Sequence, residues 1–312
     1  MPEAELRLGV IGVGALGRQH ARVAASSPGA RLVGVHDTDP GRAAAVAAEY
    51  GSRAYRDAAG LLAEVEAVTV AVPTADHHRV CREALLAGRD VLLEKPMTTT
   101  LQEADELIAI AEQRKAVLQV GHIERFNPAT DVLREIVREP RFIEVHRLGS
   151  FSPRSLDVDV VLDLMIHDLD IILALDATEA VQIEAVGVPV LTPRVDIANA
   201  RLRFASGLVA NLTASRVSVE RVRKFRVFAP RIYVSVDFTA REAQVWRLEI
   251  GPGGTPRLGC ERRGAPELEP LRRQQEAFLR AVRERSRPVV PGGEGRRALA
   301  LAHAVLERMS AV

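Results

Sequence analysis

The sequence predicts an α/β protein of two domains: an N-terminal Rossmann domain with a parallel sheet, and an α+β C-terminal domain with a mainly antiparallel open sheet. Three observations carry this prediction. A glycine-rich turn at residues 12–17 follows a short apolar run, strand-like and helix-like segments then alternate as far as about Gly121, and strand-like runs dominate after that point. The length of 312 residues also exceeds the usual span of one hydrophobic core.

The alternating half begins with residues 6–11, a short β-branched run that ends in glycines and is typical of a buried parallel strand. Further strands are predicted at 30–37, 67–74, 89–96 and 116–122, and helices at 17–26, 41–51, 78–88 and 101–114. Short links between them favour a parallel sheet with helices on both faces. We therefore expect a Rossmann domain over residues 1–122 and a second domain, with C-terminal helices, over 123–312.

In the second half, turn signals separate the strand-like runs, and one helix, predicted over 157–177, interrupts them. The runs lie at 142–151, 180–190, 197–205, 207–217, 224–230, 231–238 and 243–250. The Gly/Pro-rich stretch 251–270 predicts a loop, and two helices are expected after it, over about 271–285 and from about 294 to the end.

Composition argues against several classes of partner. The 42 Lys and Arg residues nearly balance the 41 Asp and Glu residues, so the electrostatic signature of a protein that binds nucleic acid is missing. No stretch of eighteen apolar residues and no export signal occurs, which argues against a membrane span. Cys81 and Cys260 lack the spacing of a disulfide framework or a zinc site. We expect a cytoplasmic protein.

The turn Gly12-Val13-Gly14-Ala15-Leu16-Gly17 is a full G-x-G-x-x-G match between a predicted strand and a predicted helix. The first glycine permits a tight turn, the second lets the backbone approach a pyrophosphate, and the third allows close helix packing. Asp37 ends the next predicted strand, where a carboxylate can bind the adenosine ribose hydroxyls. The carboxylate repels a 2′-phosphate, so NAD is expected rather than NADP, although Arg42 could pair with that phosphate. The alternative is a turn that binds no nucleotide.

Lys95 follows a buried strand, at the carboxyl edge of the predicted parallel sheet, where ligands bind in open α/β folds. A lysine there can donate a hydrogen bond to a substrate hydroxyl and stabilise negative charge on its oxygen. A solvated lysine at a strand end is the structural alternative.

Asp163 and His167 are four residues apart, so they share one face of the predicted helix. A histidine that titrates near neutrality suits a general base that takes a hydroxyl proton, and the carboxylate can orient it. A histidine in an apolar helix can equally be a core group. The same spacing could ligate zinc, but no third ligand with recognisable spacing follows, and we expect no metal. Arg125, in the polar segment after the last parallel strand, could bind a phosphate or form a linker salt bridge.

These motifs together resemble the Gfo/Idh/MocA oxidoreductase family, which includes glucose-fructose oxidoreductase and inositol dehydrogenase. The resemblance covers nearly the whole chain and rests on GVIGVGALGRQHARV, VPTADHH, the Glu94-Lys95-Pro96 tripeptide and the DxxxH helix. It implies that Lys95, Asp163 and His167 form the catalytic set, with His167 the base. The residues that it places at the cofactor are Gly12, Gly14, Ala15, Leu16, Gly17, Asp37, Pro73, Thr74, His77, Glu94 and Lys95.

Residues 121–129 with the 157–177 helix are most similar to the branch that acts on nucleotide sugars, such as UDP-N-acetylglucosamine 3-dehydrogenases. The segment 154–159 departs from the glycine-rich stretch that many members carry before the catalytic helix, which puts simple polyol specificity in doubt. In that branch, Arg125, Arg154 and Ser155 would face a diphosphate. The resemblance also implies a homodimer or homotetramer formed through the C-terminal sheet.

The function that follows is reversible oxidation of a secondary hydroxyl of a sugar or nucleotide sugar to a ketone, with NAD accepting hydride. Three alternatives stay open: oxidation of inositol or a free sugar, reduction of an unsaturated ring as in biliverdin-type relatives, and a regulator that senses NAD without turnover. An intact set of Lys95, Asp163 and His167 favours an enzyme, because a sensor has no need of a base.

Overall fold

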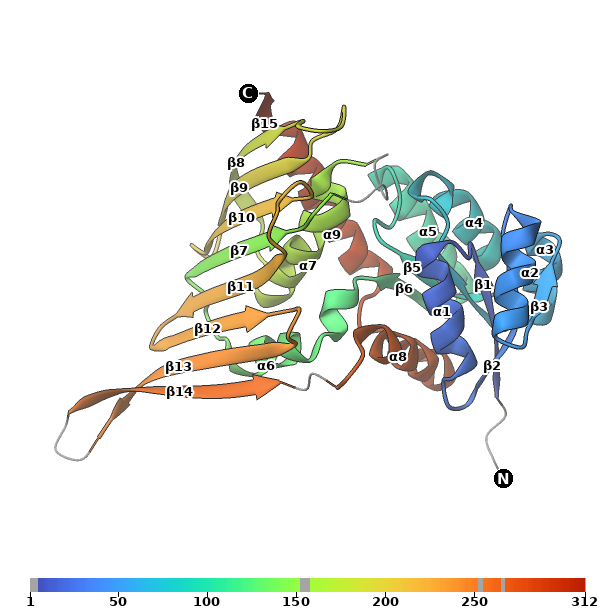
Figure 1. Cartoon of the computed structure of the whole chain (residues 1–312), viewed down its shortest axis with the longest axis horizontal. Coiled ribbons are helices and arrows are strands. Elements are labelled where there is room, and N and C mark those ends of the chain that lie inside the picture. The colour runs from blue at the N-terminus through green and yellow to red at the C-terminus, as the bar shows by residue number, and fades with distance from the viewer. Residues whose placement is uncertain (1–4, 152–157, 252–254, 265–266, 312) are drawn as a thin grey trace. The chain divides into compact units, whose positions relative to one another are not determined.

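The structure is a computed structural model that describes residues 5–151, 158–251, 255–264 and 267–311 (Figure 1). The chain divides into two compact units, and both contain residues from distant parts of the sequence. The Rossmann unit comprises residues 1–123 and 270–296, and the sheet unit comprises 124–269 and 297–312. The predicted fold class is confirmed in both units.

The Rossmann unit is built on a six-stranded parallel sheet of order β3-β2-β1-β4-β5-β6. Its strands are β1 (Leu6–Ile11), β2 (Ala30–His36), β3 (Arg53–Tyr55), β4 (Ala67–Val70), β5 (Asp90–Glu94) and β6 (Leu118–Gly121). Its helices are α1 (Ala15–Ala25), α2 (Pro40–Glu49), α3 (Ala58–Glu64), α4 (Thr74–Leu86) and α5 (Leu101–Arg114). The strand order reverses between β1 and β4, so the crevice where such folds bind ligands lies beside the glycine turn.

Local sequence sets the boundaries of several of these helices. The Asp39 carboxylate caps α2 by accepting from the Arg42 amide, and Pro40 occupies the first turn. Thr100 and Glu103 form a capping box at the start of α5. These signals explain why the helices begin where the sequence predicts them.

Helix α8 (Pro270–Glu284) belongs to the Rossmann unit, where the sequence analysis had assigned it to the C-terminal domain. Its buried Phe278, Leu279 and Val282 pack in one core with Ala21 and Ala24 of α1. The Arg285 guanidinium then pairs with Asp90, 2.7 Å away. The apolar face of α8 thus completes the Rossmann core, and the domain boundary at 122/123 omits this returning segment.

The sheet unit contains a nine-stranded, mainly antiparallel sheet of order β14-β13-β12-β11-β7-β10-β9-β8-β15. Among the described strands of this sheet, only the β7–β10 and β8–β15 pairs are parallel. The strands are β7 (Phe142–Leu148), β8 (Ala180–Val188), β9 (Ile197–Phe204), β10 (Val209–Ser215), β11 (Val222–Ala229), β12 (Ile232–Asp237), β13 (Glu242–Ile250), β14 (Pro256–Gly264) and β15 (Met309–Ala311).

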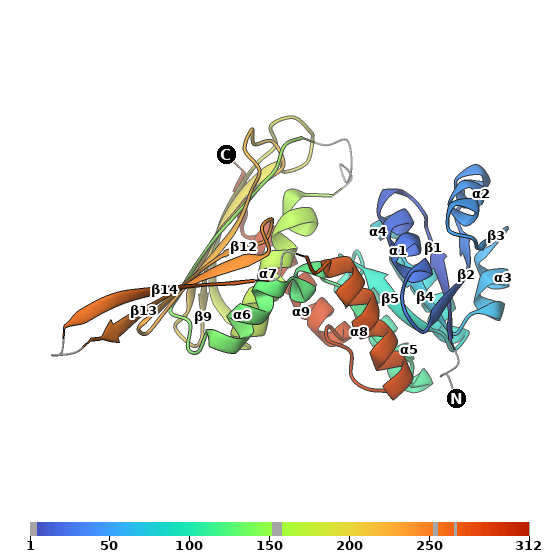
Figure 2. The same cartoon turned by 60° about the horizontal axis from the view of Figure 1, so that its bottom comes forward.

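Helices cover one face of this sheet, and Figure 2 shows α6 (Pro128–Ile136) and α7 (Ile166–Leu175) on the same side. Alternation along β9 places Ala198, Ala200, Leu202 and Phe204 in the core with α7, and turns the intervening polar residues to the other face. A short 3-10 helix, η1 (Ile123–Phe126), leads into this unit, and α9 (Gly292–Glu307) ends in the same core.

The prediction of a loop over 251–270 is wrong for residues 256–264, which form β14 in continuous register with β13. Glycine and arginine dominate this strand, so its sequence lacks the β-branched signal. Its conformation comes from pairing with β13. No helix among the described residues is long and apolar enough to cross a membrane.

Candidate functional site

The glycine turn between β1 and α1 has the geometry that a pyrophosphate site needs. Gly12 has φ +82°, and a Cβ atom there would lie 2.8 Å from the Ala71 backbone. A Cβ at Gly17 would lie 1.8 Å from the Gly12 carbonyl oxygen, whereas a Cβ at Gly14 would meet nothing within 4 Å. Two glycines therefore permit the turn and the close packing of α1, and the third leaves open space in front of the helix N-terminus.

Asp37 directly follows β2, and its carboxylate is held by backbone amides. Oδ2 accepts from the Val13 amide at 2.8 Å, and Oδ1 accepts from the Asp39 amide at 2.9 Å. Arg42 Nη1 lies 3.2 Å from Oδ1. The side chain is buried yet lines a cavity of about 350 Å³ with Gly12, Gly14, Val72 and Pro73, among others. This position suits a carboxylate that accepts hydrogen bonds from ribose hydroxyls.

The remaining residues predicted at the cofactor lie around the same crevice. Ala15 lines a second cavity, of about 310 Å³, with Gly14 and Arg42. Leu16, on the first turn of α1, is exposed, and Thr74 begins α4 directly after Pro73. Together with the glycine turn and Asp37, these residues fit the adenosine and pyrophosphate parts of NAD.

The tripeptide Glu94-Lys95-Pro96 leaves the carboxyl end of β5, and the Lys95–Pro96 bond is cis. Glu94 is buried, and its Oε1 accepts a hydrogen bond from His20 of α1, 2.8 Å away. Burial raises the pKa of Glu94, but the hydrogen bond from His20 and the charges of His20 and Lys95 outweigh it and hold the pKa below its ordinary value. A buried carboxylate thus fixes the end of β5 beside the half-buried Lys95.

His77 of α4 contacts the same tripeptide from the other side. Its Nδ1 lies 2.8 Å from the Pro96 carbonyl oxygen, and its Nε2 lies 3.0 Å from the Val72 carbonyl oxygen. Burial lowers the pKa of this imidazole, so the neutral form is favoured. With only 1% of His77 exposed, the ring joins the residues that follow β4 and β5.

In the sheet unit, Asp163 and His167 lie where a π-helical turn, η2 (Val161–Met165), runs into α7. Such π-turns are frequent at functional sites. His167 is buried, and Asp163 is half-buried and lines a cavity. The predicted catalytic pair therefore occupies an irregular turn at the beginning of a buried helix.

A buried network of charged side chains connects α7 to strand β7. Arg147 of β7 donates to both carboxylate oxygens of Asp168 at 2.7 Å and to Glu124 Oε1 at 2.9 Å. Although burial alone would lower the pKa of Arg147, the two carboxylates hold it above its ordinary value. Because Asp168 neighbours His167, this bidentate pair restrains the turn that carries the predicted catalytic pair.

The predicted substrate residues have different outcomes. Arg125 is buried, and its Nη1 lies 3.3 Å from Asp170 Oδ1 of α7. It therefore forms a salt bridge within the protein, which was one of the two alternatives for this residue. Arg154 and Ser155 lie outside the described residues. No sequence signal singled out the arginines that do line the cavity beside Asp163. They are Arg147, Arg216, Arg221 and Arg223.

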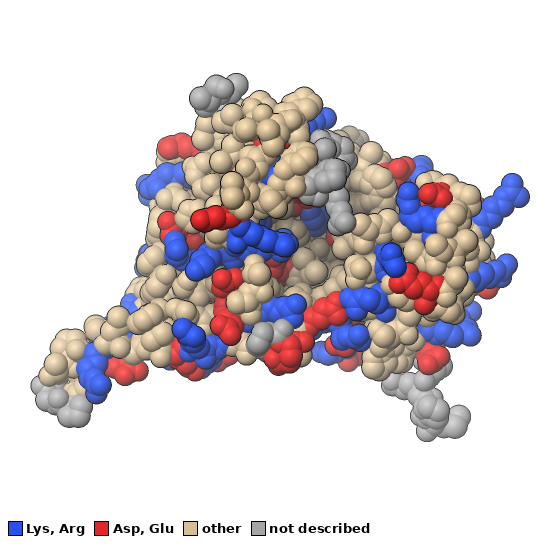
Figure 3. Space-filling view, in the orientation of Figure 1, with Lys and Arg blue, Asp and Glu red and all other residues tan. Residues whose placement is uncertain are grey.

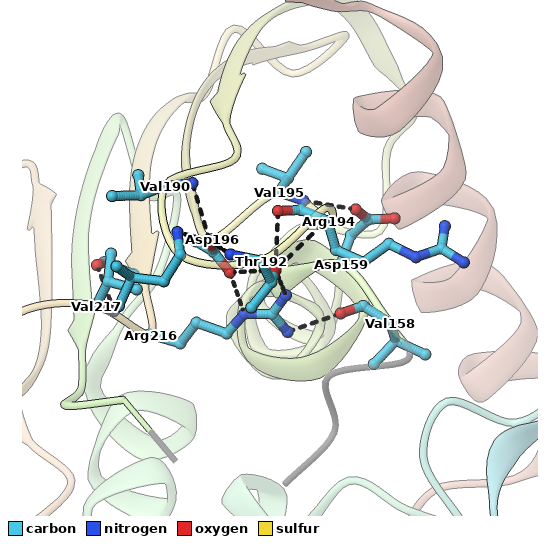
Figure 4. Close-up of polar contacts among 11 residues, drawn as sticks. Val158, Asp159, Val190, Thr192, Arg194, Val195, Asp196, Arg216 and Val217 are labelled. Carbon is cyan, nitrogen blue, oxygen red and sulfur yellow. Dashed lines mark hydrogen bonds and ion pairs between the residues drawn. The ribbon is translucent and has the colours of Figure 1, made fainter. Parts of the chain in front are cut away.

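Arg216 is held by a buried carboxylate, Asp196, which Figure 4 shows surrounded by donors. Asp196 Oδ1 accepts from Arg216 Nε at 2.8 Å, and Oδ2 accepts from the amides of residues 190–192. Arg216 Nη1 in turn donates to the Val158 carbonyl at 2.7 Å. Because Val158 precedes η2, this chain of contacts anchors the segment that leads into η2. Within the described ranges, no group of three His, Cys, Asp or Glu side chains is arranged to hold a metal ion.

Comparisons with known proteins place the chain among dehydrogenases. A family described as an oxidoreductase family with an NAD-binding Rossmann fold matches residues 6–122. UDP-N-acetylglucosamine 3-dehydrogenase from Acidithiobacillus ferrooxidans is 44% identical over 299 residues, 95% of each chain. Its solved structure, at 42% identity, superposes with a TM-score of 0.93 over 98% of this chain and 97% of that one. Inositol 2-dehydrogenase from Rhizobium meliloti is 27% identical over 98% of this chain and 97% of its own length.

Proposed function

The chain belongs to the Gfo/Idh/MocA family of NAD-binding oxidoreductases, and from this premise we propose that it oxidises a nucleotide sugar, UDP-N-acetylglucosamine, at the C3 hydroxyl. The observation that carries the proposal is the identity of 44%, sustained over 95% of both chains, with a relative named for that activity. The arginine-lined cavity beside Asp163 is a second support, because an inositol or a free sugar carries no anion for it.

The Rossmann unit would hold the cofactor with residues of known geometry. The open backbone at Gly14 and the N-terminus of α1 receive the pyrophosphate, and Asp37 receives the ribose hydroxyls. When bound, NAD supplies the hydride acceptor for the reaction. Glu94, His20 and His77 hold the end of β5 in place beside it.

The proposed proton chemistry uses the three residues of the predicted catalytic set. His167 accepts the proton of the reacting hydroxyl as general base, while the carbon loses its hydride and the oxygen becomes a carbonyl. Lys95 donates a hydrogen bond to that oxygen and stabilises its developing negative charge. Asp163 acts as a positioning residue that orients the imidazole. In the reductive direction, the His167 imidazolium returns the proton.

We also propose that the chain assembles into a homodimer or homotetramer through the sheet unit. The sheet face opposite the helices carries a cluster of Phe142, Phe228 and Tyr233, in which the last two rings stack 4.7 Å apart. The β13–β14 hairpin exposes Leu248, Ile250 and Leu258. Size-exclusion chromatography with light scattering measures the molar mass of the assembly. The double substitution Leu248→Asp and Leu258→Asp, which places charges on this exposed apolar surface, should lower that mass. A monomeric wild-type protein would contradict the proposed assembly.

The decisive experiment for the activity is absorbance at the reduced-nicotinamide band. Purified protein and NAD are mixed with UDP-N-acetylglucosamine, other UDP-sugars, myo-inositol and free sugars. We expect signal with UDP-N-acetylglucosamine and none with inositol, and mass spectrometry of the product should place the ketone at C3. Turnover of inositol alone would replace the proposed substrate, and NAD binding without any turnover would favour a sensor.

A further inference from the structure

The cavity beside Asp163 has a volume of about 300 Å³ and lies entirely within the sheet unit. Arginines from β7, from the residue after β10, and from the start of β11 contribute to its wall, with Asp163 and Leu164 from η2 opposite. Figure 3 shows Lys and Arg side chains gathered on this part of the unit, over β7 and β11. The cavity therefore joins a cationic wall to the catalytic turn.

Two of the four guanidinium groups form salt bridges with carboxylates of the protein. Arg147 is bound by Asp168 and Glu124, and Arg216 is bound by Asp196. None of these three carboxylates lines the cavity. Two arginines are left to face a ligand, Arg221 and Arg223.

Arg221 and Arg223 are in a different situation from the other two. The nearest carboxylate oxygen to Arg223 is Glu124 Oε1, 3.8 Å from Nη1, and Glu124 already accepts a hydrogen bond from Arg147. Arg221 is exposed, and within residues 5–151, 158–251, 255–264 and 267–311 no carboxylate forms an ion pair with it. Both guanidinium groups can therefore turn toward a ligand.

The sheet register makes this arrangement costly in the absence of an anion. Arg223 lies directly opposite Arg147 in the antiparallel β7–β11 pair, and like charges at opposed positions are destabilising. Arg223 also shares its face of β11 with the buried Phe225 and Val227. Burial and then the charge of Arg147 lower the pKa of Arg223, against the opposing effect of Glu124. An anion in the cavity would relieve this repulsion.

We propose that Arg221 and Arg223 bind the diphosphate of the nucleotide-sugar substrate and thereby direct its sugar toward Asp163 and His167. This inference rests on the proposed function and names the part of the substrate that the cavity recognises. Guanidinium groups suit the task because their forked donors bind phosphate oxygens in pairs. The site also distinguishes a nucleotide sugar from a neutral polyol, which carries no charge for these arginines.

The test compares Arg221→Ala, Arg223→Ala and the double variant with the wild-type holoenzyme. Each single substitution should raise the KM for UDP-N-acetylglucosamine about tenfold to a hundredfold, the scale of a lost charge-assisted phosphate contact, with the KM for NAD unchanged. Arg223→Lys should recover part of the loss. Arg134→Ala, which removes an exposed arginine from α6 of the same unit, is the matched control and should match the wild type.

A binding measurement separates this inference from the proposed activity. By calorimetry with NAD present, UDP should bind more tightly than UMP and far more tightly than uridine, and the double variant should lose that difference. An unchanged KM and unchanged UDP affinity in the double variant would overturn the inference while leaving the activity intact. If the wild type failed to oxidise UDP-N-acetylglucosamine, loss of UDP binding in the double variant would still support the cavity as a diphosphate site. N-acetylglucosamine 1-phosphate binding as tightly as UDP would overturn the diphosphate assignment in favour of a sugar monophosphate.

Discussion

The glycine turn of the Rossmann unit is formed mainly by backbone, whereas the basic cavity of the sheet unit is formed by side chains. The turn is made of backbone: three glycines within six residues set its path, and one carboxylate joins it to the next strand. The cavity is made of side chains from β7, β11 and η2, which are far apart in sequence. Under the two proposals above, a diphosphate is bound by backbone amides in the Rossmann unit and by guanidinium groups in the sheet unit.

This difference follows from what each site must recognise. A cofactor that is common to the whole family can be bound by a fixed backbone shape, which leaves little room for variation. A substrate that differs between relatives is better bound by side chains, because single substitutions change them without disturbing the fold. We therefore expect substitutions in the turn to act on folding and cofactor affinity, and substitutions around the cavity to act on the substrate.

The largest effect on turnover is expected at the turn that carries Asp163 and His167. His167→Ala should lower turnover by a hundredfold to about ten-thousandfold, the usual scale for a lost general base, while NAD affinity stays nearly unchanged. Steady-state kinetics and a separate NAD titration check both parts. His78→Ala removes a surface histidine that pairs with Glu106 and serves as the control. Normal turnover in His167→Ala would remove this residue from the role of base.

Two alanine substitutions in the glycine turn should separate folding from binding. Gly17→Ala places a Cβ atom 1.8 Å from the Gly12 carbonyl oxygen, so it should lower the free energy of unfolding by about 3 kcal/mol or more. Gly14→Ala meets open space and should leave thermal unfolding unchanged, yet raise the Kd for NAD about tenfold. Equal NAD affinity in Gly14→Ala and the wild type would mean that the pyrophosphate lies elsewhere.

The same contrast explains what could be predicted from the sequence. The turn, Asp37 and the end of β5 are local patterns in which neighbouring residues fix the conformation, and the structure has all three as expected. Asp163 and His167 were predicted to share one helical face because they are four residues apart, and the structure places them in consecutive helical turns. The structure adds that this face is partly π-helical, which no residue type in the segment indicates.

The cavity could not be found in this way because it depends on strand register. Arg147 and Arg223 meet only because β7 and β11 pair antiparallel, although the chain between them contains three other strands. The one available signal was the basic run from Arg221 to Arg226, of which only the part from Lys224 on was included in a predicted strand. The contact of Arg125 with Asp170 is non-local in the same way, because Asp170 lies on a helix 45 residues later. The packing of α8 on α1 is a third non-local contact of this kind.

Asp196 offers a test of how far side chains hold the sheet unit together. Burial raises the pKa of its carboxyl group, but the hydrogen bonds from Arg216, Thr192 and the nearby amides outweigh burial and hold the pKa well below its ordinary value. The stabilisation is therefore present above the ordinary carboxyl pKa of about 3.9 and is lost as pH falls toward the folded-state value. Asp196→Asn should lower the free energy of unfolding by about 2 kcal/mol at pH 7 and by less in acid. Denaturant titrations across pH, with the surface change Asp57→Asn as control, measure this, and a pH-independent difference would contradict it.

The smallest effect concerns the choice between NAD and NADP, where the turn itself depends on one side chain. Asp37 accepts from the Val13 amide and lies 3.2 Å from Arg42, so the carboxylate both shapes the turn and engages the neighbouring guanidinium. Asp37→Ala removes the ribose acceptor and leaves Arg42 available for a 2′-phosphate, so NAD should weaken more than NADP, with the ratio of the two Kd values shifting about tenfold. Asp37→Asn keeps an oxygen for the Val13 amide and should give the same shift with less loss of stability. Adding Arg42→Ala to either variant should abolish any gain for NADP, because it removes the guanidinium that lies beside residue 37. A cofactor ratio that stays constant through all of these variants would place the ribose contact on another residue.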